Sequence, residues 1–491
     1  MKIDCFLPFH NISQILETIQ SLCNSELINK IYIVTDKENI AIPEPCELIT
    51  ADSIYSTSTL QKIAEKTDAD YTLIYTRQDI LKMGMLGLER MAQIAHDTEG
   101  GLLYADHYQI TNQTKKNHPL VTYQKGSLRD DFNFGSVLFY NSATFKKAVA
   151  RMNKQYQYAG LYDLRLKISQ ISEIIHINEY LYIQINNDER KSGEKIFDYV
   201  DPKNRAVQLE MEEVCTGHLK EIDAYLEPEF KEVNLNDSTF TYEASVIIPV
   251  KNRVNTISDA IESVLNQKTD FRFNLIVVDN YSTDGTTEAI DKYTQDDRVI
   301  HIIPSQKDLG IGGCWNVGVH LPGCGKFAVQ LDSDDVYSDE NTLQKIVDAF
   351  YEQKCAMIVG TYKLTDFDMN TIPPGIIDHK EWTPDNGRNN ALRINGLGAP
   401  RAFFTPLLRE INVPNTSYGE DYALGLRFSR EYRIGRIYDV LYLCRRWEGN
   451  SDASLDVEKM NAHNTYKDRL RTWEIEARIA LNKKKRSNEK I

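Results

Sequence analysis

The pattern that most constrains the fold of this chain is a strand, helix, strand order near its middle. Residues 245–250 (SVIIPV) and 274–278 (NLIVV) are short and almost entirely apolar, as expected of strands that are covered on both faces in a parallel sheet. Residues 256–266, between them, place apolar side chains at helical spacing. A third apolar run, residues 326–331, ends in an acidic turn. Alternating strands and helices predict an α/β fold with ligands at the carboxyl ends of the strands.

The first half of the chain repeats this order. Strand-like runs occupy residues 2–8, 30–34 and 71–75, and a helical run occupies residues 12–22. Later segments also align, residues 132–139 with 398–404 and residues 158–169 with 418–429. The sequence therefore predicts a tandem repeat of one α/β fold with mainly parallel central sheets.

A chain of 491 residues is too long for one compact core. Polar and charged stretches near its middle flank a helical segment and mark a linker. We predict a first domain at residues 1–190, a helical linker at 191–243, a second domain at 244–454, and a C-terminal helix with a basic tail at 455–491. We expect this last helix to extend to about residue 481 and to pack on or beside the second domain.

Charge and composition exclude several classes of protein. A formal net charge of −14 disfavours nucleic-acid binding, which depends on Lys and Arg neutralising phosphates. No apolar run approaches the roughly 20 residues that span a bilayer, so we expect a soluble, cytoplasmic protein. The eight cysteines are dispersed without a C-x-x-C pair, which favours free thiols over disulfides or zinc. The basic run at 483–486 predicts either a solvated tail or peripheral contact with the inner face of the membrane.

The strongest local signal is a cluster of three carboxylates, Asp332, Asp334 and Asp335, directly after the third strand. Oxygen ligands one residue apart suit Mg²⁺ or Mn²⁺, with a substrate diphosphate completing the shell. The same residues could instead form an Asp-rich turn before the next helix, because Asp is a favoured cap. A calcium loop of the EF-hand type is disfavoured, because its glycine is missing. Taken alone, the cluster does not separate the first two interpretations.

Four motifs in a fixed order give this cluster a context. They are residues 245–253 (SVIIPVKNR), 277–285 (VVDNYSTDG), 331–335 (LDSDD) and 419–422 (GEDY). In this combination they resemble the GT-A glycosyltransferases of glycosyltransferase family 2. The resemblance covers residues 244–448 and implies a Rossmann-like domain that transfers a sugar from a nucleotide-diphosphate donor.

The resemblance also implies roles at the nucleotide. Pro249, Asn252 and Arg253 would shape the loop over the nucleotide-sugar, and Asp279 would accept hydrogen bonds from the base. Asn316 follows a glycine-rich stretch that precedes the acidic cluster in the family as well. Two of these features also have plainer interpretations. The segment around Asp279 is rich in residues that favour turns, and the glycines before Asn316 would also serve a tight turn.

For the metal and the chemistry, the resemblance implies that Asp332 approaches the ribose or sugar and that Asp334 binds Mn²⁺ or Mg²⁺, with Asp332 or Asp335 beside it. Asp421 matches the family's base, and Glu420 is its neighbour. Acidic residues are also favoured at a helix N-terminus by the dipole, and both interpretations can hold together. Direct displacement by the acceptor implies an inverting enzyme.

One departure from the family pattern concerns the metal shell. Many relatives have a histidine after the last core strand, whereas this chain has Arg445, Arg446 and Trp447. Arg445 or Arg446 could bind diphosphate oxygens, because guanidinium matches their geometry. Trp447, with Arg401, is a candidate contact of the acceptor sugar, although a large aromatic is more often part of the core.

The first half lacks these chemical groups. It has Thr76, Arg77, Gln78 and Asp79 where the second half has Asp332, Ser333, Asp334 and Asp335, so one carboxylate remains and an arginine has entered. It has Gly160 and Leu161 where the second half has the late acidic pair. An arginine would repel a divalent cation. We therefore expect a degenerate GT-A-like domain that acts as a scaffold, an acceptor-binding module or a dimer surface. The rival interpretation is a second transferase that needs no metal.

The leading hypothesis is thus a metal-dependent glycosyltransferase in polysaccharide or glycoconjugate synthesis. A UDP-sugar is the favoured donor, and a saccharide or lipid-linked glycan is the acceptor. The alternative is a non-catalytic scaffold that binds nucleotide-sugars or glycans, which would have no need of a base. A nucleotidyltransferase is disfavoured, because the loop at 250–253 has no glycine.

Overall fold

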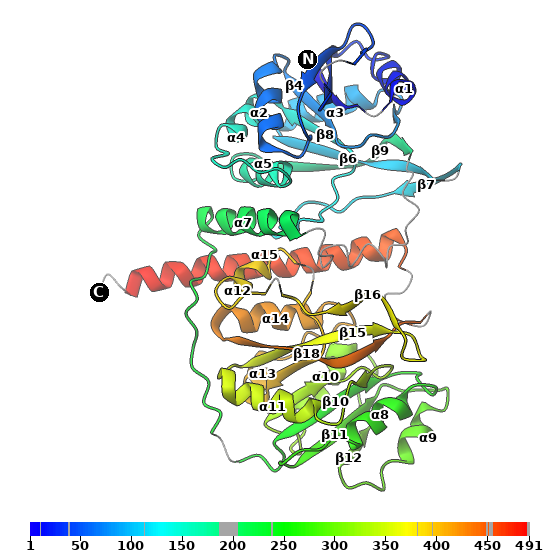
Figure 1. Ribbon diagram of the computed structural model, residues 1–491, viewed down its shortest axis with the longest axis vertical. Helices are drawn as coiled ribbons and strands as arrows, with labels where there is room; N and C mark the ends of the chain where they lie inside the picture. Colours follow the sequence, from blue (N-terminus) through cyan, green and yellow to red (C-terminus); the bar gives the residue numbers. More distant parts are fainter. Residues whose placement is uncertain are drawn as a thin grey trace. The chain divides into compact units, whose positions relative to one another are not determined.

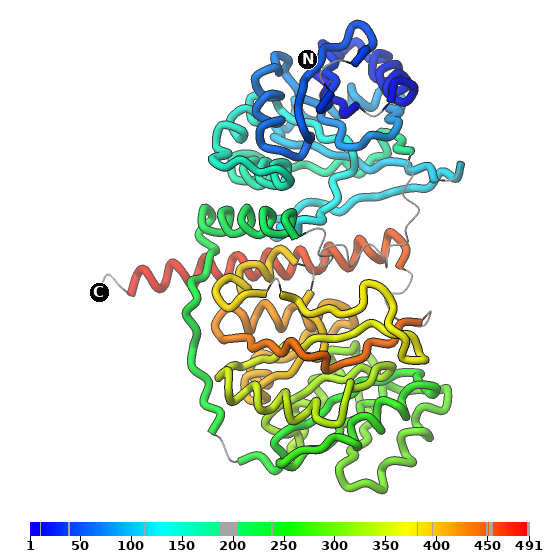
Figure 2. Tube along the Cα trace, viewed as in Figure 1, coloured from blue at the N-terminus to red at the C-terminus, as the bar shows by residue number. Residues whose placement is uncertain are grey.

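The structure is a computed structural model of the chain and describes residues 1–9, 11–37, 40–111, 113–185, 205–236, 239–380, 382–394, 396–447, 450 and 455–488. The chain divides into two compact units. Unit 1 combines Met1–Tyr225 with Leu455–Ile491, and unit 2 is Leu226–Ser454 (Figures 1 and 2). The first division falls inside the predicted linker, of which residues 191–204 lie outside the described part.

Unit 1 is an α/β sandwich around one nine-stranded sheet. Its strands are β1 (Ile3–Pro8), β2 (Ile28–Thr35), β3 (Glu47–Thr50), β4 (Tyr71–Tyr75), β5 (Leu81–Met83), β6 (Leu102–Thr111), β7 (Thr114–His118), β8 (Val137–Asn141) and β9 (Ile174–Ile185). Its helices are α1 (Ile12–Leu22), α2 (Thr57–Lys66), α3 (Gly87–Thr98), α4 (Ser142–Val149), α5 (Gly160–Ile168), α7 (Arg205–Glu221) and α15 (Val457–Asn488). Apolar cores cover both faces of the sheet.

Unit 2 repeats this plan. Its strands are β10 (Ala244–Val250), β11 (Phe273–Asp279), β12 (Val299–Ile302), β13 (Phe327–Gln330), β14 (Val336–Tyr337), β15 (Met357–Thr365), β16 (Thr371–Ile377), β17 (Arg401–Phe404) and β18 (Ile434–Arg445). Its helices are α8 (Ile257–Leu265), α9 (Thr286–Asp291), α10 (Ile311–Val319), α11 (Thr342–Gln353), α12 (Gly387–Asn390), α13 (Thr405–Ile411) and α14 (Glu420–Glu431).

The two sheets have the same strand order. Unit 1 runs β3-β2-β1-β4-β8-β6-β9-β5, and unit 2 runs β12-β11-β10-β13-β17-β15-β18-β14, each with one further strand paired to the sixth in that order. The α/β class and the tandem repeat are confirmed. In each sheet the first four strands are parallel and form the Rossmann-like part. The remaining strands pair in both directions, so each sheet is mixed beyond that part.

Local sequence explains the central elements. In β10 the apolar residues are buried because the strand lies between two parallel neighbours and is covered on both faces. Helix α1 begins at the predicted residue, because the Asn11 side chain accepts a hydrogen bond from the Gln14 amide and caps the helix. Helix α8 buries Ile257, Ala260 and Ile261 on one face.

The long helix α15 belongs to unit 1, so the expectation that it packs on the second domain was wrong. Asp468 accepts hydrogen bonds from Ser127 at 2.9 Å and Arg129 at 3.3 Å. Gly126 lies so close to the helix backbone that an added Cβ would overlap Thr472. The helix continues to Asn488, beyond the expected end near residue 481, and includes the basic run 483–486.

Two further expectations can be compared with the described residues. All eight cysteines are free. None of the helices in the described part of the chain combines the length with the apolar character that crossing a bilayer requires.

Candidate active site in unit 2

Two loops at the carboxyl ends of β10 and β11 are bonded to each other. Asn252 has a left-handed backbone with φ of 56°, which asparagine tolerates better than most residues. Its amide donates to the Ser282 hydroxyl at 2.9 Å, and its side-chain oxygen accepts from the Thr283 amide at 2.8 Å. The Arg253 amide donates to Thr286 Oγ1 at 2.7 Å. These bonds fix the predicted nucleotide loop on the sheet.

Asp279, the predicted base-binding residue, is fully buried at the end of β11. One carboxylate oxygen accepts from the Ser282 amide at 2.9 Å and the other from Thr287 Oγ1 at 2.6 Å. His301 Nε2 lies 3.7 Å from the carboxylate. Asp279 therefore shapes the turn, in agreement with the plainer interpretation, and its place at the sheet end is also where the family-based role requires it.

The other two predicted nucleotide residues lie nearby in the fold. Pro249 is in β10 opposite Val278. The side chain of Asn316, on α10, donates to the Val413 carbonyl at 2.7 Å and accepts from the Val413 amide at 2.9 Å. Asn316 thus holds the segment after α13 against α10.

The acidic cluster follows β13, where the third loop leaves the sheet. Asp332 accepts from the Gln330 side chain at 3.0 Å, and its amide donates to the Tyr442 hydroxyl at 3.0 Å. Burial is the main cause that raises the pKa of Asp332, and the neighbouring Asp334 raises it further, while Arg401 opposes both. The site therefore carries negative charge that is only partly compensated.

Asp334 is the most heavily contacted carboxylate of the cluster. Its Oδ2 accepts from Trp447 Nε1 at 3.2 Å and from the Asn450 side chain at 3.3 Å. Arg253 Nε lies 3.7 Å from the same oxygen. Arg253 from the first loop, Asp334 from the third and Trp447 after β18 are thereby brought together.

Asp335 and Arg445 form the buried floor of this cluster. The Arg445 amide donates to Asp335 Oδ1 at 2.7 Å, and the Arg445 guanidinium donates to the Asp334 carbonyl and to Asp259 at 2.6 Å each. Burial raises the pKa of Asp335 well above its usual range, with the charges of Asp332 and Asp334 adding to the effect. Arg445 is therefore a structural support in this state, and one of its guanidinium nitrogens is buried without a partner among the described residues.

The late acidic pair lies at the start of α14. Asp421 Oδ2 is 2.8 Å from Arg401 Nη1, and its Oδ1 accepts from the Tyr422 amide. Burial raises the pKa of Glu420 to about 8, with the charge of Asp421 as the next cause. Asp332 also contributes to the electrostatic environment of both Arg401 and Glu420. Asp332 and the predicted base Asp421 are thus linked through Arg401, whose guanidinium interacts with both carboxylates.

The carboxylates of this site could bind a divalent metal only if the substrate and water supplied the remaining ligands. Within the described residues, no group of three His, Cys, Asp or Glu side chains surrounds a point where a metal could bind. Asp334 and Asp332 could supply two oxygen ligands. The pKa values of Asp332 and Asp335 are raised by burial first and by the neighbouring carboxylates second, and a bound cation would oppose both effects. Substrate diphosphate oxygens and water would have to complete the shell.

Sequence reasoning named most of these residues but missed their connections. The partners it missed are Tyr442 for Asp332, Asn450 for Asp334 and Asp259 for Arg445. No local signal marks such pairs, because they join segments about 110 or more residues apart. Arg446, predicted at the diphosphate, has its amide bonded to the Thr365 carbonyl in the β15 and β18 pair.

In unit 1 the corresponding sheet end has Thr76, Arg77 and Gln78 in place of the acidic cluster, as the matching strand registers place them. Asp163, in the first turns of α5, is paired with Lys167 at 3.8 Å. Burial raises the pKa of Asp163 to about 6. No equivalent of the Arg401 and Asp421 pair is found at Gly160 and Leu161.

Comparison with known proteins agrees with this geometry. Residues 245–411 match the profile of the family described as "Glycosyl transferase family 2". The putative teichuronic acid biosynthesis glycosyltransferase TuaG of Bacillus subtilis is 29% identical over 148 residues, which is 30% of this chain and 58% of that protein. The poly(ribitol-phosphate) beta-glucosyltransferase of Bacillus spizizenii is 25% identical over 212 residues, 41% of this chain and 32% of that protein.

Two solved structures are also similar. S. aureus TarS 1-349 in complex with UDP-GlcNAc has a TM-score of 0.37 and 22% identity, covering 48% of this chain and 72% of that one. The mannosyltransferase PcManGT from Pyrobaculum calidifontis, in complex with GDP-Man and Mn²⁺, has a TM-score of 0.35 and 16% identity, covering 59% of this chain and 86% of that one.

The profile match concerns unit 2, and both this match and the curated relatives point to glycosyltransferases. Segment 245–411 of unit 2 belongs to glycosyl transferase family 2. The chain spans little more than half the length of TuaG and a smaller part of the glucosyltransferase.

Proposed function

We propose that unit 2 is a metal-dependent, inverting glycosyltransferase that moves a sugar from a nucleotide-diphosphate donor, preferentially a UDP-sugar, to a saccharide or lipid-linked acceptor. One observation carries this proposal. The loops after β10, β11 and β13 are tied together at one sheet end, with Asp332 beside the Arg401, Glu420 and Asp421 group. The residues proposed for the donor site and for the base therefore lie at one edge of the sheet.

The donor would be held from two sides. The Asn252 loop and Asp279 form the part that would receive the nucleoside, and Asp334 and Asp332 form the part that would receive the diphosphate. A divalent cation bound by Asp334 and Asp332 would screen the diphosphate charge and stabilise the leaving nucleoside diphosphate. Arg253, at 3.7 Å from Asp334, lies where it could contact the same phosphates.

Asp421 is the proposed general base. Arg401 and the Tyr422 amide each hold one of its oxygens, so its orientation is set before the acceptor arrives. A base on one side of the anomeric carbon and the leaving group on the other would give direct displacement and inversion. Glu420 is a positioning residue in this scheme, because its burial and raised pKa keep a proton next to Asp421 through neutral pH.

The acceptor class is proposed from the relatives. Their names refer to teichuronic acid biosynthesis and to poly(ribitol-phosphate). Glycopolymer chains or their lipid-linked precursors are therefore the acceptors we propose to test first.

The decisive experiment is calorimetric titration of the full chain with UDP, GDP, CDP and ADP, with and without Mn²⁺. We expect one nucleotide to bind in a Mn²⁺-dependent way, and Asp334→Asn to abolish that dependence. Asp297→Asn, which removes an exposed carboxylate elsewhere in unit 2, is the matched control and should bind like the wild type.

Transfer is then measured with the matching labelled nucleotide-sugar and a set of glycopolymer acceptors. A product with inverted anomeric configuration supports the proposal. Nucleotide binding without any donor turnover, in the presence of every acceptor and both metals, would favour the non-catalytic scaffold instead.

A further inference from the structure

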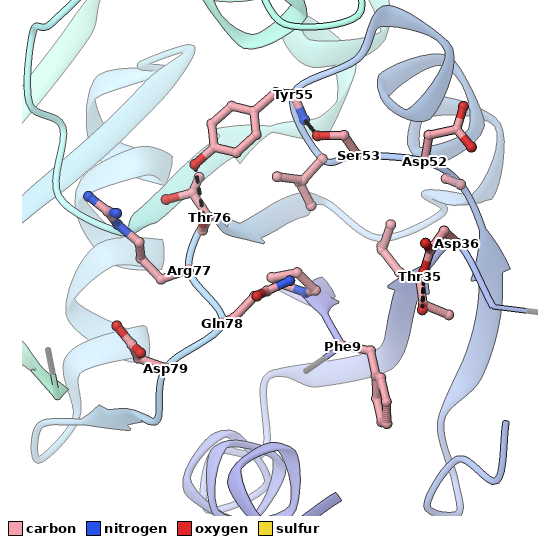
Figure 3. Close-up of a pocket in the computed structure, with 14 residues that line it drawn as sticks. Phe9, Thr35, Asp36, Asp52, Ser53, Tyr55, Thr76, Arg77, Gln78 and Asp79 are labelled. Atoms are coloured by element: carbon pink, nitrogen blue, oxygen red, sulfur yellow. Dashed lines mark hydrogen bonds between the residues drawn. The ribbon is translucent and has the colours of Figure 1, made fainter. Parts of the chain in front are cut away.

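Unit 1 has a pocket at the sheet end that corresponds to the proposed donor site of unit 2. The pocket has a volume of about 630 Å³, within the usual range for small-molecule sites. It lies at the carboxyl ends of β1, β2 and β4 and beside the segment after β3 (Figure 3). Pro8 pairs with Val34 as Pro249 pairs with Val278, so the two sheet ends correspond residue by residue.

The lining of this pocket is acidic. It contains three carboxylates, Asp36, Asp52 and Asp79, against one guanidinium, Arg77, a formal charge of −2. Figure 3 shows Asp36 and Asp52 on one side of the space and Arg77 and Asp79 on the other. A nucleoside diphosphate would meet net repulsion here. In unit 2 a cation bound by Asp332 and Asp334 would offset this repulsion. Unit 1 has Thr76 and Gln78 at those two positions and so lacks the carboxylates that would bind the cation.

The remaining groups suit a neutral ligand with many hydroxyls. Asp36 and Asp52 are exposed, and an ionised carboxylate can accept several hydrogen bonds from hydroxyls. Gln78 offers both an acceptor and two donors. Among the described residues, no side-chain hydrogen bond occupies the Asp52 carboxylate, so its acceptors are available to a ligand.

Aromatic surface is present as well. Tyr55 lines the pocket, and its hydroxyl donates to the Thr76 carbonyl at 3.1 Å, which holds the ring at one side of the space (Figure 3). A ring held in this way presents an apolar face next to polar groups. Carboxylates beside aromatic faces are a combination that binds the hydroxyl and C–H surfaces of a sugar ring.

We propose that this pocket of unit 1 is a saccharide-binding site that uses no metal and carries out no transfer. Its ligand class is a neutral glycan, bound through Asp36, Asp52 and Gln78 and against the ring of Tyr55. This site is independent of the transfer proposed for unit 2, because it belongs to a different sheet and a different set of loops.

The test is saturation-transfer difference NMR of the full chain with the methyl glycosides of glucose, galactose, mannose, N-acetylglucosamine and N-acetylgalactosamine, all in EDTA. We expect at least one glycoside to bind. The double variant Asp36→Asn/Asp52→Asn should weaken binding about tenfold or more, since each carboxylate loses charge-assisted hydrogen bonds.

Three controls fix the interpretation. The variant Glu65→Gln/Asp68→Asn removes the same charge from exposed positions of unit 1 outside the pocket lining and should bind like the wild type. Asp334→Asn should also bind normally. The pocket variants should retain the thermal unfolding midpoint of the wild type, because both changed side chains are exposed.

Two results would overturn the proposal. One is the absence of binding by every glycoside to the wild type. The other is a glycoside signal that disappears in Asp334→Asn, or is displaced by UDP in EDTA, while it persists in Asp36→Asn/Asp52→Asn. Loss of the signal in Asp334→Asn would mean that the saccharide binds to unit 2. Displacement by UDP would mean that the glycoside occupies a nucleotide site.

Discussion

The loop after β4 in unit 1 and the loop after β13 in unit 2 occupy the same position in two sheets of one strand order. One loop carries Thr76, Arg77 and Gln78, and the other carries Asp332, Ser333 and Asp334. The strands that precede both loops are buried and apolar. The two units therefore differ in a few residues at the sheet end, on which the proposed binding of a metal and a diphosphate depends, while the strands before them are alike.

The largest expected effect comes from the late acidic pair. Asp421→Asn should lower kcat by about 10²–10⁴, the usual contribution of a general base, with little change in nucleotide affinity. The reverse change in unit 1, Leu161→Asp, should create no new activity. Steady-state kinetics with the donor identified by calorimetry measures both. An Asp421→Asn enzyme with wild-type kcat would remove this residue from the mechanism.

The next effect tests the acidic cluster. Asp334→Gln gives unit 2 the residue of unit 1, and transfer should fall about 10²–10³-fold, because metal stabilisation of the leaving group is worth several kcal/mol. Gln78→Asp should leave transfer unchanged. Mn²⁺ titrations of the rate distinguish a lost metal site from a general loss of structure. If both variants lowered transfer equally, the two sheet ends would share one function.

Asp279 should have a smaller effect that is confined to binding. Asp279→Asn should weaken nucleoside diphosphate binding about tenfold, because one hydrogen bond to a charged acceptor is lost. Thr35, the corresponding residue in the β1 and β2 register, should tolerate Ala without any change in nucleotide binding. Calorimetry on the folded variants provides the measurement, and equal affinity of Asp279→Asn and wild type would assign Asp279 to the turn alone.

The smallest effect concerns stability. The folded-state pKa of Glu420 is raised from 4.5 to about 8, so the folded protein binds more protons than the unfolded chain in this window. Stability should therefore fall as pH rises from about 5 to about 8, with a slope of at most about 1.4 kcal/mol per pH unit. Urea unfolding of Glu420→Gln should show a flatter profile.

Asp163 in unit 1 is the comparison for that experiment. Its pKa is raised from 3.8 to about 6, so Asp163 should contribute a fall in stability with rising pH that is complete near pH 6. Asp163→Asn should remove that fall. A Glu420→Gln profile that matched the wild type above pH 6 would mean that the Glu420 carboxyl titrates as it does in water.

The sequence predicted the helices and strands whose own apolar spacing is typical of that element. Helix α1 and strand β4 have the expected bounds, and β10 and β11 lie where the apolar runs placed them. The family motifs found the residues of the site but not their partners. Arg401 was expected at the acceptor and is paired with Asp421 at 2.8 Å. Pairing between β17 and α14 is a tertiary event that neither segment signals by itself.

Helix α15 was placed with the wrong unit for a related reason. Its mean pattern is polar, and its buried residues include Lys467, Asp468, Arg471, Glu474 and Arg478. A helix that buries charged side chains gives no apolar stripe from which its partner surface can be inferred. Asp468 pairs with Arg129, which only the folded unit brings to it, while Arg478 pairs with Glu474 one turn earlier on the same helix.

The place of α15 in unit 1 sets an order of assembly during synthesis. Residues 226–454, the whole of unit 2, are made between the two parts of unit 1, which at ordinary elongation rates takes roughly ten to fifty seconds. For that interval the surface around Gly126 and Arg129 is without the helix that covers it. Unit 2 is continuous in sequence, so it can complete its fold before unit 1 is closed.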